Sequence, residues 1–209
     1  MAAFDERTAL LVVDVQNDFA DPSGSLSVAG GDKVVEAANR YVGQAREAGA
    51  LVVYTQDWHP ESTPHFAKDG GVWPVHCVAE TWGAELHPGL SVVGEVVRKG
   101  SNGEDGYSGF SMRDPATGEE IPTALEGMLR DRGVERVAIC GLATDYCVNA
   151  TALDAVRLGF ATEVLTDAIA AVNLQPADGA RALEAMADAG AELVGAGSAG
   201  APSTEAPRH

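Results

Sequence analysis

Three side chains far apart in this sequence have the chemistry of nucleophilic catalysis. Cys147 offers a thiol nucleophile, and Asp14 offers a carboxylate that can take the thiol proton and return it to a leaving group. Lys99 would balance the charge of Asp14 and favour the thiolate. If Thr144 begins a helix, Cys147 lies in its first turn, where free N–H groups and the helix dipole also favour a thiolate. The ordinary alternatives are a small buried cysteine, a loop-capping aspartate and a solvated lysine.

A second group of residues has the chemistry of a metal site. Asp57 and His59 form an Asp-x-His pair, which places two ligands on one side of an extended segment, and His65 and His76 can fold back towards them. Mixed oxygen and nitrogen ligands suit zinc, iron or manganese, whereas a structural zinc site favours thiolates. Histidines on Pro-rich loops are also often plain surface residues. Here, however, four of the five histidines lie between residues 59 and 87.

The other two cysteines are interpreted as packing residues. Cys140 ends the apolar run RVAIC and is expected in the core, and Cys77 directly follows a candidate ligand histidine. Three cysteines cannot all pair, and a chain of this length does not need disulfide bonds to fold.

The hydrophobic pattern predicts the elements that must position these residues. Short apolar runs, typical of strands buried on both faces, alternate with helical patterns. The predicted strands are 9–13, 51–55, 92–97, 134–140, 161–165 and 191–194. The predicted helices are 32–48 (capped by Asp32 and stopped by Gly49), 121–133, 144–159 and 176–190. This βαβ alternation predicts an α/β fold, a three-layer α/β/α sandwich around a mostly parallel sheet.

The candidate residues follow four of the predicted strands. Asp14 follows the first strand, Asp57 and His59 the second, Lys99 the third, and the fourth runs into a turn that leads to Cys147. In open parallel sheets, ligands bind at the carboxyl ends of the strands. An acid, metal-type ligands, a base and a thiol are therefore expected at one edge of the sheet.

Length and charge exclude several classes of protein. The 209 residues can bury about 70% of the unfolded surface, which supports one domain over residues 1–194. The Gly-, Ala-, Ser- and Pro-rich segment 195–209 is expected to be a disordered tail. The net charge of −17 repels phosphate backbones and anionic membranes, so neither nucleic acid nor membrane is an expected partner.

The start of the chain lacks the features of a targeting segment. The apolar run 9–13 is too short to span a bilayer, and acidic Asp5 and Glu6 stand where a signal peptide carries positive charge. We therefore expect a soluble, cytoplasmic protein. Whether it forms a homo-oligomer is left open.

Six motifs in this sequence resemble those of one known family. They are DVQNDF (14–19), DWHP (57–60), WPVHC (73–77), RKG (98–100), YSGF (107–110) and GLATDYCV (141–148). In this order they resemble the nicotinamidase/pyrazinamidase branch of the isochorismatase-like cysteine hydrolases, and the resemblance extends to about residue 194.

The resemblance implies a fold, a reaction and a set of catalytic residues. The fold is an α/β/α sandwich with a six-stranded sheet, and the reaction is hydrolysis of a linear amide, nicotinamide, to nicotinate and ammonia in NAD salvage. The implied triad is Asp14, Lys99 and Cys147. A cis peptide bond between Leu142 and Ala143 would direct the N–H groups of Ala143 and Cys147 towards the oxyanion.

The resemblance also implies a metal ion and an aromatic binding site. One divalent ion, Zn²⁺ with Fe²⁺ or Mn²⁺ as alternatives, would bind Asp57, His59 and His76. His65 matches a position that is a ligand in some members and not in others. The residues implied to hold the pyridine ring are Phe19, Trp73 and Tyr107.

Two other functions remain open from the sequence. One is another amidohydrolase of the same superfamily, acting on a carbamoyl or ureido group. The other is a non-catalytic metal-binding or redox-sensing protein that uses Cys77, Cys140 and Cys147. Such a protein would not need Asp14 and Lys99.

Overall fold

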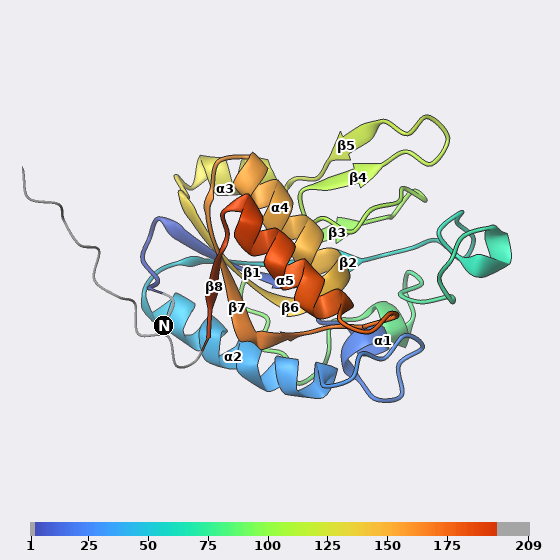
Figure 1. Cartoon of the computed structure of the whole chain (residues 1–209), viewed down its shortest axis with the longest axis horizontal. Helices are drawn as coiled ribbons and strands as arrows, with labels where there is room; N and C mark the ends of the chain where they lie inside the picture. The colour runs from blue at the N-terminus through green and yellow to red at the C-terminus, as the bar shows by residue number, and fades with distance from the viewer. Residues whose placement is uncertain (1–2, 196–209) are drawn as a thin grey trace, which may run out of the picture.

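A six-stranded sheet, parallel throughout, forms the middle layer of the protein (Figure 1). The structure is a computed structural model and describes residues 3–195. The strand order is β3-β2-β1-β6-β7-β8. The strands are β1 (Thr8–Val13), β2 (Leu51–Asp57), β3 (Glu95–Lys99), β6 (Arg136–Leu142), β7 (Ala161–Ala170) and β8 (Glu192–Val194). The predicted α/β/α sandwich with a six-stranded parallel sheet is confirmed.

Helices cover both faces of this sheet. Helix α2 (Gly31–Glu47) lies on one face, and α3 (Leu125–Asp131), α4 (Asn149–Arg157) and α5 (Asp178–Ala189) lie on the other. Side chains alternate between the faces of a strand, so Leu10 and Val12 of β1 pack in the core beneath α2, whereas Leu11 and Val13 pack beneath α3–α5. Burial on both faces explains why these strands are apolar without alternation.

The chain reverses its direction across the sheet between β1 and β6, which lie side by side. From β1 it adds β2 and β3 on one side, and from β6 it adds β7 and β8 on the other. Such a switch point is where open α/β sheets bind ligands. Gly141 brings the two strand ends close together, because a Cβ atom there would lie 2.0 Å from the carbonyl oxygen of Val13.

Several predicted elements have different bounds in the structure: the predicted strand 134–140 is Arg136–Leu142, and the predicted strand 161–165 extends to Ala170. The third strand starts at Glu95 rather than at residue 92 and runs to Lys99, so Lys99 is part of the strand. The predicted helix 121–133 is shortened to α3, and its first residues form β5 (Glu120–Pro122), paired antiparallel with β4 (Ser111–Arg113). Pro122 explains the difference, because a proline disfavours the helical conformation of the residue before it.

The starts of the other helices also differ from the predictions. Gly30, with φ +84°, is the N-cap of α2, and Asp32 lies within its first turn instead of capping it. The predicted helix 144–159 begins as a π-helical turn, Thr144–Val148, and becomes α4 at Asn149. The peptide bond just before this turn, Leu142–Ala143, is cis, as the family resemblance implies.

The long segments between strands are ordered loops with short helical turns. A short helix α1 (Asn17–Ala20) follows β1, and 3₁₀ turns lie at Ala67–Asp69 and Trp82–Ala84. Of the tail predicted over residues 195–209, all but Gly195 lies outside the described residues. Within residues 3–195, no helix combines the length and the apolar character needed to cross a membrane.

Candidate active site

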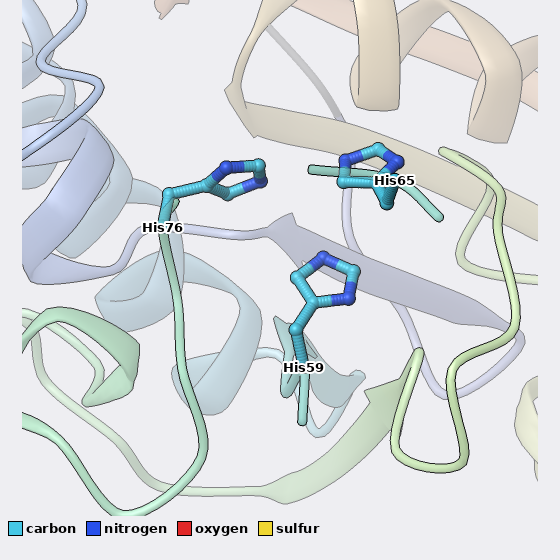
Figure 2. Close-up of side chains that lie close together, drawn as sticks. All are labelled: His59, His65 and His76. Carbon is cyan, nitrogen blue, oxygen red and sulfur yellow. The ribbon is translucent and has the colours of Figure 1, made fainter. Parts of the chain in front are cut away.

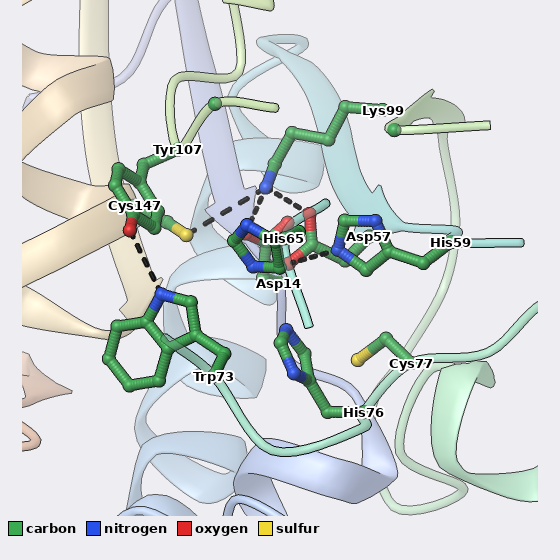
Figure 3. Close-up of polar contacts among 12 residues, drawn as sticks. Asp14, Asp57, His59, His65, Trp73, His76, Cys77, Lys99, Tyr107 and Cys147 are labelled. Atoms are coloured by element: carbon green, nitrogen blue, oxygen red, sulfur yellow. Dashed lines mark hydrogen bonds and ion pairs between the residues drawn. The ribbon is translucent and has the colours of Figure 1, made fainter. Parts of the chain in front are cut away.

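A buried lysine joins the ends of three strands to the candidate nucleophile (Figure 3). Lys99 is register partner of Asp57 across β2 and β3, and only 1% of its side chain is exposed. Its Nζ atom is hydrogen-bonded to Asp57 Oδ1, lies 2.9 Å from Asp14 Oδ2 and lies 3.7 Å from Cys147 Sγ. The ammonium thus donates hydrogen bonds to Asp57 and Cys147 and forms an ion pair with Asp14.

Asp14 is held in one orientation by the neighbouring strand. It directly follows β1 in a left-handed conformation (φ +48°), and its backbone N–H donates to Thr55 Oγ1 at 3.2 Å. The Thr55 hydroxyl donates to Asp14 Oδ1 at 2.6 Å, so each carboxylate oxygen has its own partner. Thr55 was not among the predicted site residues, since a threonine inside a buried strand carries no pattern of its own.

Asp57 is fixed through its backbone by Gln16, which the sequence analysis also missed. Gln16 is fully buried; its Oε1 accepts from the Asp57 N–H at 2.8 Å, and its Nε2 donates to the Asp57 carbonyl at 2.7 Å. Gln16 lies inside the DVQNDF motif, and that position was the available signal.

Burial controls the protonation of this cluster. Burial raises the pKa of Asp14, and Lys99 only partly opposes this effect. For Lys99 itself, burial would lower the pKa, but Asp14 and Asp57 hold it well above its usual value. A carboxylate with a raised pKa is a better acceptor for a thiol proton.

Burial opposes the features of the sequence that favour a thiolate at Cys147. Burial raises the pKa of the Cys147 thiol well above its ordinary value, and the attraction of Lys99 does not offset it. Two carboxylates already outnumber one ammonium here, so a thiolate would add a second net negative charge. The resting residue is therefore a thiol.

Cys147 lies at the switch point, in the π-helical turn that follows the cis bond. Its Sγ atom is within 4.8 Å of carboxylate oxygens of both Asp14 and Asp57. Together with Ala143, it lines a pocket above the cluster. The structure thus brings the predicted acid, base and thiol together.

Three buried histidines face one another beside this cluster (Figure 2). Ring nitrogens of His59, His65 and His76 all lie within 4.8 Å of one another. The ring centroids are 4.9 to 5.3 Å apart. Asp57 joins them from the ion cluster, since its Oδ2 atom lies 3.8 Å from His59 Nε2. Three of the four predicted metal ligands therefore form one group, and the fourth, Asp57, reaches it through His59.

The hydrogen bonds of these rings fit a metal ion. Both ring nitrogens of His59 are buried without a hydrogen-bond partner among the described residues. His76 donates from Nδ1 to the carbonyl of Pro74 at 2.7 Å, and His65 donates from Nδ1 to Asp105 Oδ1 at 2.7 Å. This leaves the Nε2 lone pairs of His65 and His76 available, as in metal-binding histidines. Burial lowers the pKa of His59 to about 4 and also lowers that of His76, which keeps both rings neutral.

A pocket lined largely by aromatic side chains opens beside the Cys147 thiol and the rings of His65 and His76. Trp73 Nε1 donates to the Tyr107 hydroxyl at 2.9 Å. The Trp73 ring also meets the Tyr146 ring edge-on, with 4.8 Å between the ring centroids. The three predicted ring-binding residues, Phe19, Trp73 and Tyr107, all line this pocket. The lining residues not predicted are Leu26, Val28, Tyr146 and Val172. Tyr146 was detectable as the neighbour of Cys147, whereas the other three stand in loops without a recognisable pattern.

Neither of the remaining cysteines lines the pocket above Cys147. Cys140 is buried in the core beneath α2, and Cys147 lies in the core on the opposite face of the sheet. Cys77 is fully buried, and its backbone N–H donates to Asp18 Oδ2 at 2.7 Å. The sheet thus separates two of the three thiols that a redox sensor would have to pair.

Comparison with known proteins identifies relatives over nearly the whole chain. The isochorismatase domain matches residues 8–198. A nicotinamidase of Escherichia coli (strain K12) is 41% identical, and the alignment covers 88% of this chain and 93% of the relative.

Two solved structures are similar in both fold and sequence. The pyrazinamidase of Pyrococcus horikoshii, in complex with zinc, superposes with a TM-score of 0.80 at 44% identity, covering 90% of this chain and 99% of that chain. PnC1 from L. infantum, in complex with nicotinate, superposes with a TM-score of 0.83 at 37% identity, covering 93% and 96%.

The lowered pKa of His59 predicts acid sensitivity of the metal-free protein. Above the ordinary value of 6.5, the ring is neutral in both the folded and the unfolded chain, and its contribution is complete. Between pH 6.5 and about 4, only the unfolded chain binds the proton. The free energy of unfolding therefore decreases as the pH is lowered through this range. The total loss is about 3 kcal/mol.

Urea unfolding of the chelator-treated protein across this pH range measures that loss. A His59→Gln variant should have a flatter pH dependence, because its ring proton is gone while the rest of the cluster remains. Equal slopes for the two proteins would contradict the assignment to His59.

Proposed function

The chain belongs to the isochorismatase family, and we propose that it is a nicotinamidase that hydrolyses nicotinamide to nicotinate and ammonia, and pyrazinamide in the same way. The observation that carries this proposal is the convergence of Cys147, Asp14 and Lys99 at an aromatic pocket that His65 and His76 of the histidine cluster also line. The pocket suits one flat ring, and the thiol lies at its base. Relatives with this activity, and a related structure that holds nicotinate, support the same conclusion.

The first half of the reaction forms a thioester. The Cys147 thiol gives its proton to Asp14, and the sulfur attacks the carboxamide carbon. The N–H groups of Ala143 and Cys147 are proposed to hold the oxyanion, and one such donor is worth about 3 kcal/mol. Asp14 then returns the proton to the leaving nitrogen, and ammonia departs.

The second half of the reaction restores the thiol. Asp14, again a carboxylate, takes a proton from a water molecule that attacks the thioester carbon. The C–S bond breaks, nicotinate is released, and the proton returns to the Cys147 sulfur. In both halves of the reaction, the positive charge of Lys99 offsets part of the negative charge of Asp14 and Asp57.

Asp57, His59, His65 and His76 are proposed to hold one divalent metal ion, with zinc favoured because a related pyrazinamidase is in complex with zinc. When bound, the ion would supply a Lewis-acid position for the ring nitrogen of the substrate. Phe19 and Trp73 would stack on the ring, and Tyr107 would hold Trp73 in place through its hydroxyl.

The nucleophile is tested by removing the thiol. Cys147→Ala should lower kcat/KM for nicotinamide at least about 10⁴-fold, because no other thiol reaches the pocket, and should keep the fold and the metal content. Cys140→Ser is the matched control: it should reduce stability by roughly 1–3 kcal/mol through a buried hydroxyl and keep the chemistry. Substantial turnover by Cys147→Ala would remove Cys147 from this role.

The metal site is tested by elemental analysis of purified variants. Asp57→Ala, His59→Ala and His76→Ala should each lower the bound metal well below one equivalent, and His65→Ala should have an equal or smaller effect. His87→Ala, outside the cluster, should keep the wild-type content. If all four cluster variants retain a full equivalent, the ion binds elsewhere.

The substrate class is tested by ammonia release from a panel of amides. Nicotinamide and pyrazinamide should be the best substrates. Benzamide has the same ring shape without the ring nitrogen, and its kcat/KM should be at least about 10-fold lower. An aliphatic amide should be poorer still, since it cannot stack.

The same panel separates the proposal from its rival. Benzamide as good as nicotinamide would refute recognition of the ring nitrogen. A carbamoyl amino acid as the best substrate would replace the nicotinamidase assignment with a carbamoyl or ureido hydrolase.

A further inference from the structure

We propose that Asp105 is a positioning residue that makes His65 a ligand of the metal site. This inference rests on the proposed metal binding and extends it to a residue outside the cluster. The sequence left open whether His65 is a ligand. In this chain, the hydrogen bond between Asp105 and His65 would decide the question.

The contact fixes both the proton and the direction of the His65 ring. Asp105 Oδ1 lies 2.7 Å from His65 Nδ1, and a carboxylate can only accept, so Nδ1 carries the hydrogen. Nε2 is then the ring nitrogen that is free to bind an ion, and the His65 ring lies beside those of His59 and His76 (Figure 2). This is the only hydrogen bond of the His65 ring within the part of the chain that is described.

Asp105 is itself held firmly enough to act as an anchor. Its backbone N–H donates to the carbonyl of Arg113 at 2.8 Å, and the N–H of Arg113 donates back. The N–H of Gly106 donates to the same Oδ1 atom at 2.9 Å. These bonds tie the carboxylate to the β4–β5 hairpin, whereas His65 belongs to the long loop after β2.

The loop that carries Asp105 also backs His59. Gly100, with φ +77°, begins this loop directly after Lys99, and a Cβ atom at Gly100 would lie 2.7 Å from His59 Nδ1. The backbone at Gly100 therefore lies against His59, and Asp105 of the same loop is hydrogen-bonded to His65. Residues 100–106 form an outer wall of the histidine cluster and connect it to the strand that ends at Lys99.

A carboxylate behind a ligand histidine has a known physical effect. It orients the ring and makes the far nitrogen a better donor, and its loss costs about 10- to 100-fold in metal affinity. Without Asp105, the buried His65 ring would lose the one hydrogen bond that the described residues give it, and with it the preference for a hydrogen on Nδ1. We therefore expect Asp105 to act through His65 and not through the general stability of the fold.

A double-mutant cycle on zinc affinity tests this inference. Metal-free wild type, Asp105→Ala, His65→Ala and the double variant are titrated with Zn²⁺ against a competing chelator. Asp105→Ala should weaken binding about 10- to 100-fold, and it should add no further loss in the His65→Ala background. Asp105→Asn, whose amide oxygen can still accept from Nδ1, should lie between wild type and Asp105→Ala.

Two controls separate a positioning role from a structural one. Asp114 accepts two backbone N–H bonds in the turn between β4 and β5 and does not contact the histidines, so Asp114→Ala should keep the wild-type affinity. With Co²⁺ in place of zinc, Asp105→Ala and His65→Ala should share one visible spectrum that differs from that of wild type.

Either of two results would overturn the inference. In one, Asp105→Ala binds Zn²⁺ as tightly as wild type. In the other, Asp105→Ala weakens binding equally with and without His65. Neither result depends on amide hydrolysis, so a failed Cys147 or substrate test would leave this measurement intact.

Discussion

The constraint on which this structure depends is the burial of one ammonium group. Lys99 is 1% exposed, and taking its charge out of water costs several kcal/mol unless partners replace the solvent. Asp14 and Asp57 supply those partners only because β1, β2 and β3 are adjacent, parallel and in register at their carboxyl ends. The strand arrangement that pairs this lysine is therefore also the arrangement that builds the site.

The charge balance of this cluster sets the resting state of the nucleophile. Two carboxylates and one ammonium leave one net negative charge, which opposes a thiolate at Cys147. The same burial that keeps the thiol protonated raises the pKa of Asp14 and prepares it to receive the proton. Reactivity then depends on a substrate that occupies the pocket and on the positive charge that the histidine cluster is proposed to bind. A solvent-exposed thiol would not have its pKa raised by burial in this way.

Much of the site could be predicted because apolar runs and strand ends are local features. The run 9–13 had to be a buried strand, so Asp14 had to stand at its end, and the same reasoning placed Asp57 and the turn before Cys147. Lys99 was expected just after a third strand at 92–97, whereas the strand is offset and Lys99 is its last residue. The predicted helix 121–133 was partly wrong because Pro122 signals both a helix start and an extended residue before it.

The sequence by itself determined the fold class, the strand ends that meet, and the types of side chain that they carry, since hydrophobic periodicity and residue chemistry are written along the chain. Only the tertiary structure decided which partners those side chains have. Thr55 on Asp14 and Asp105 on His65 join residues about forty positions apart through side chains with no pattern of their own. The protonation of Cys147 was also decided there, because a pKa depends on burial and on the sum of nearby charges, and both exist only once the chain has folded.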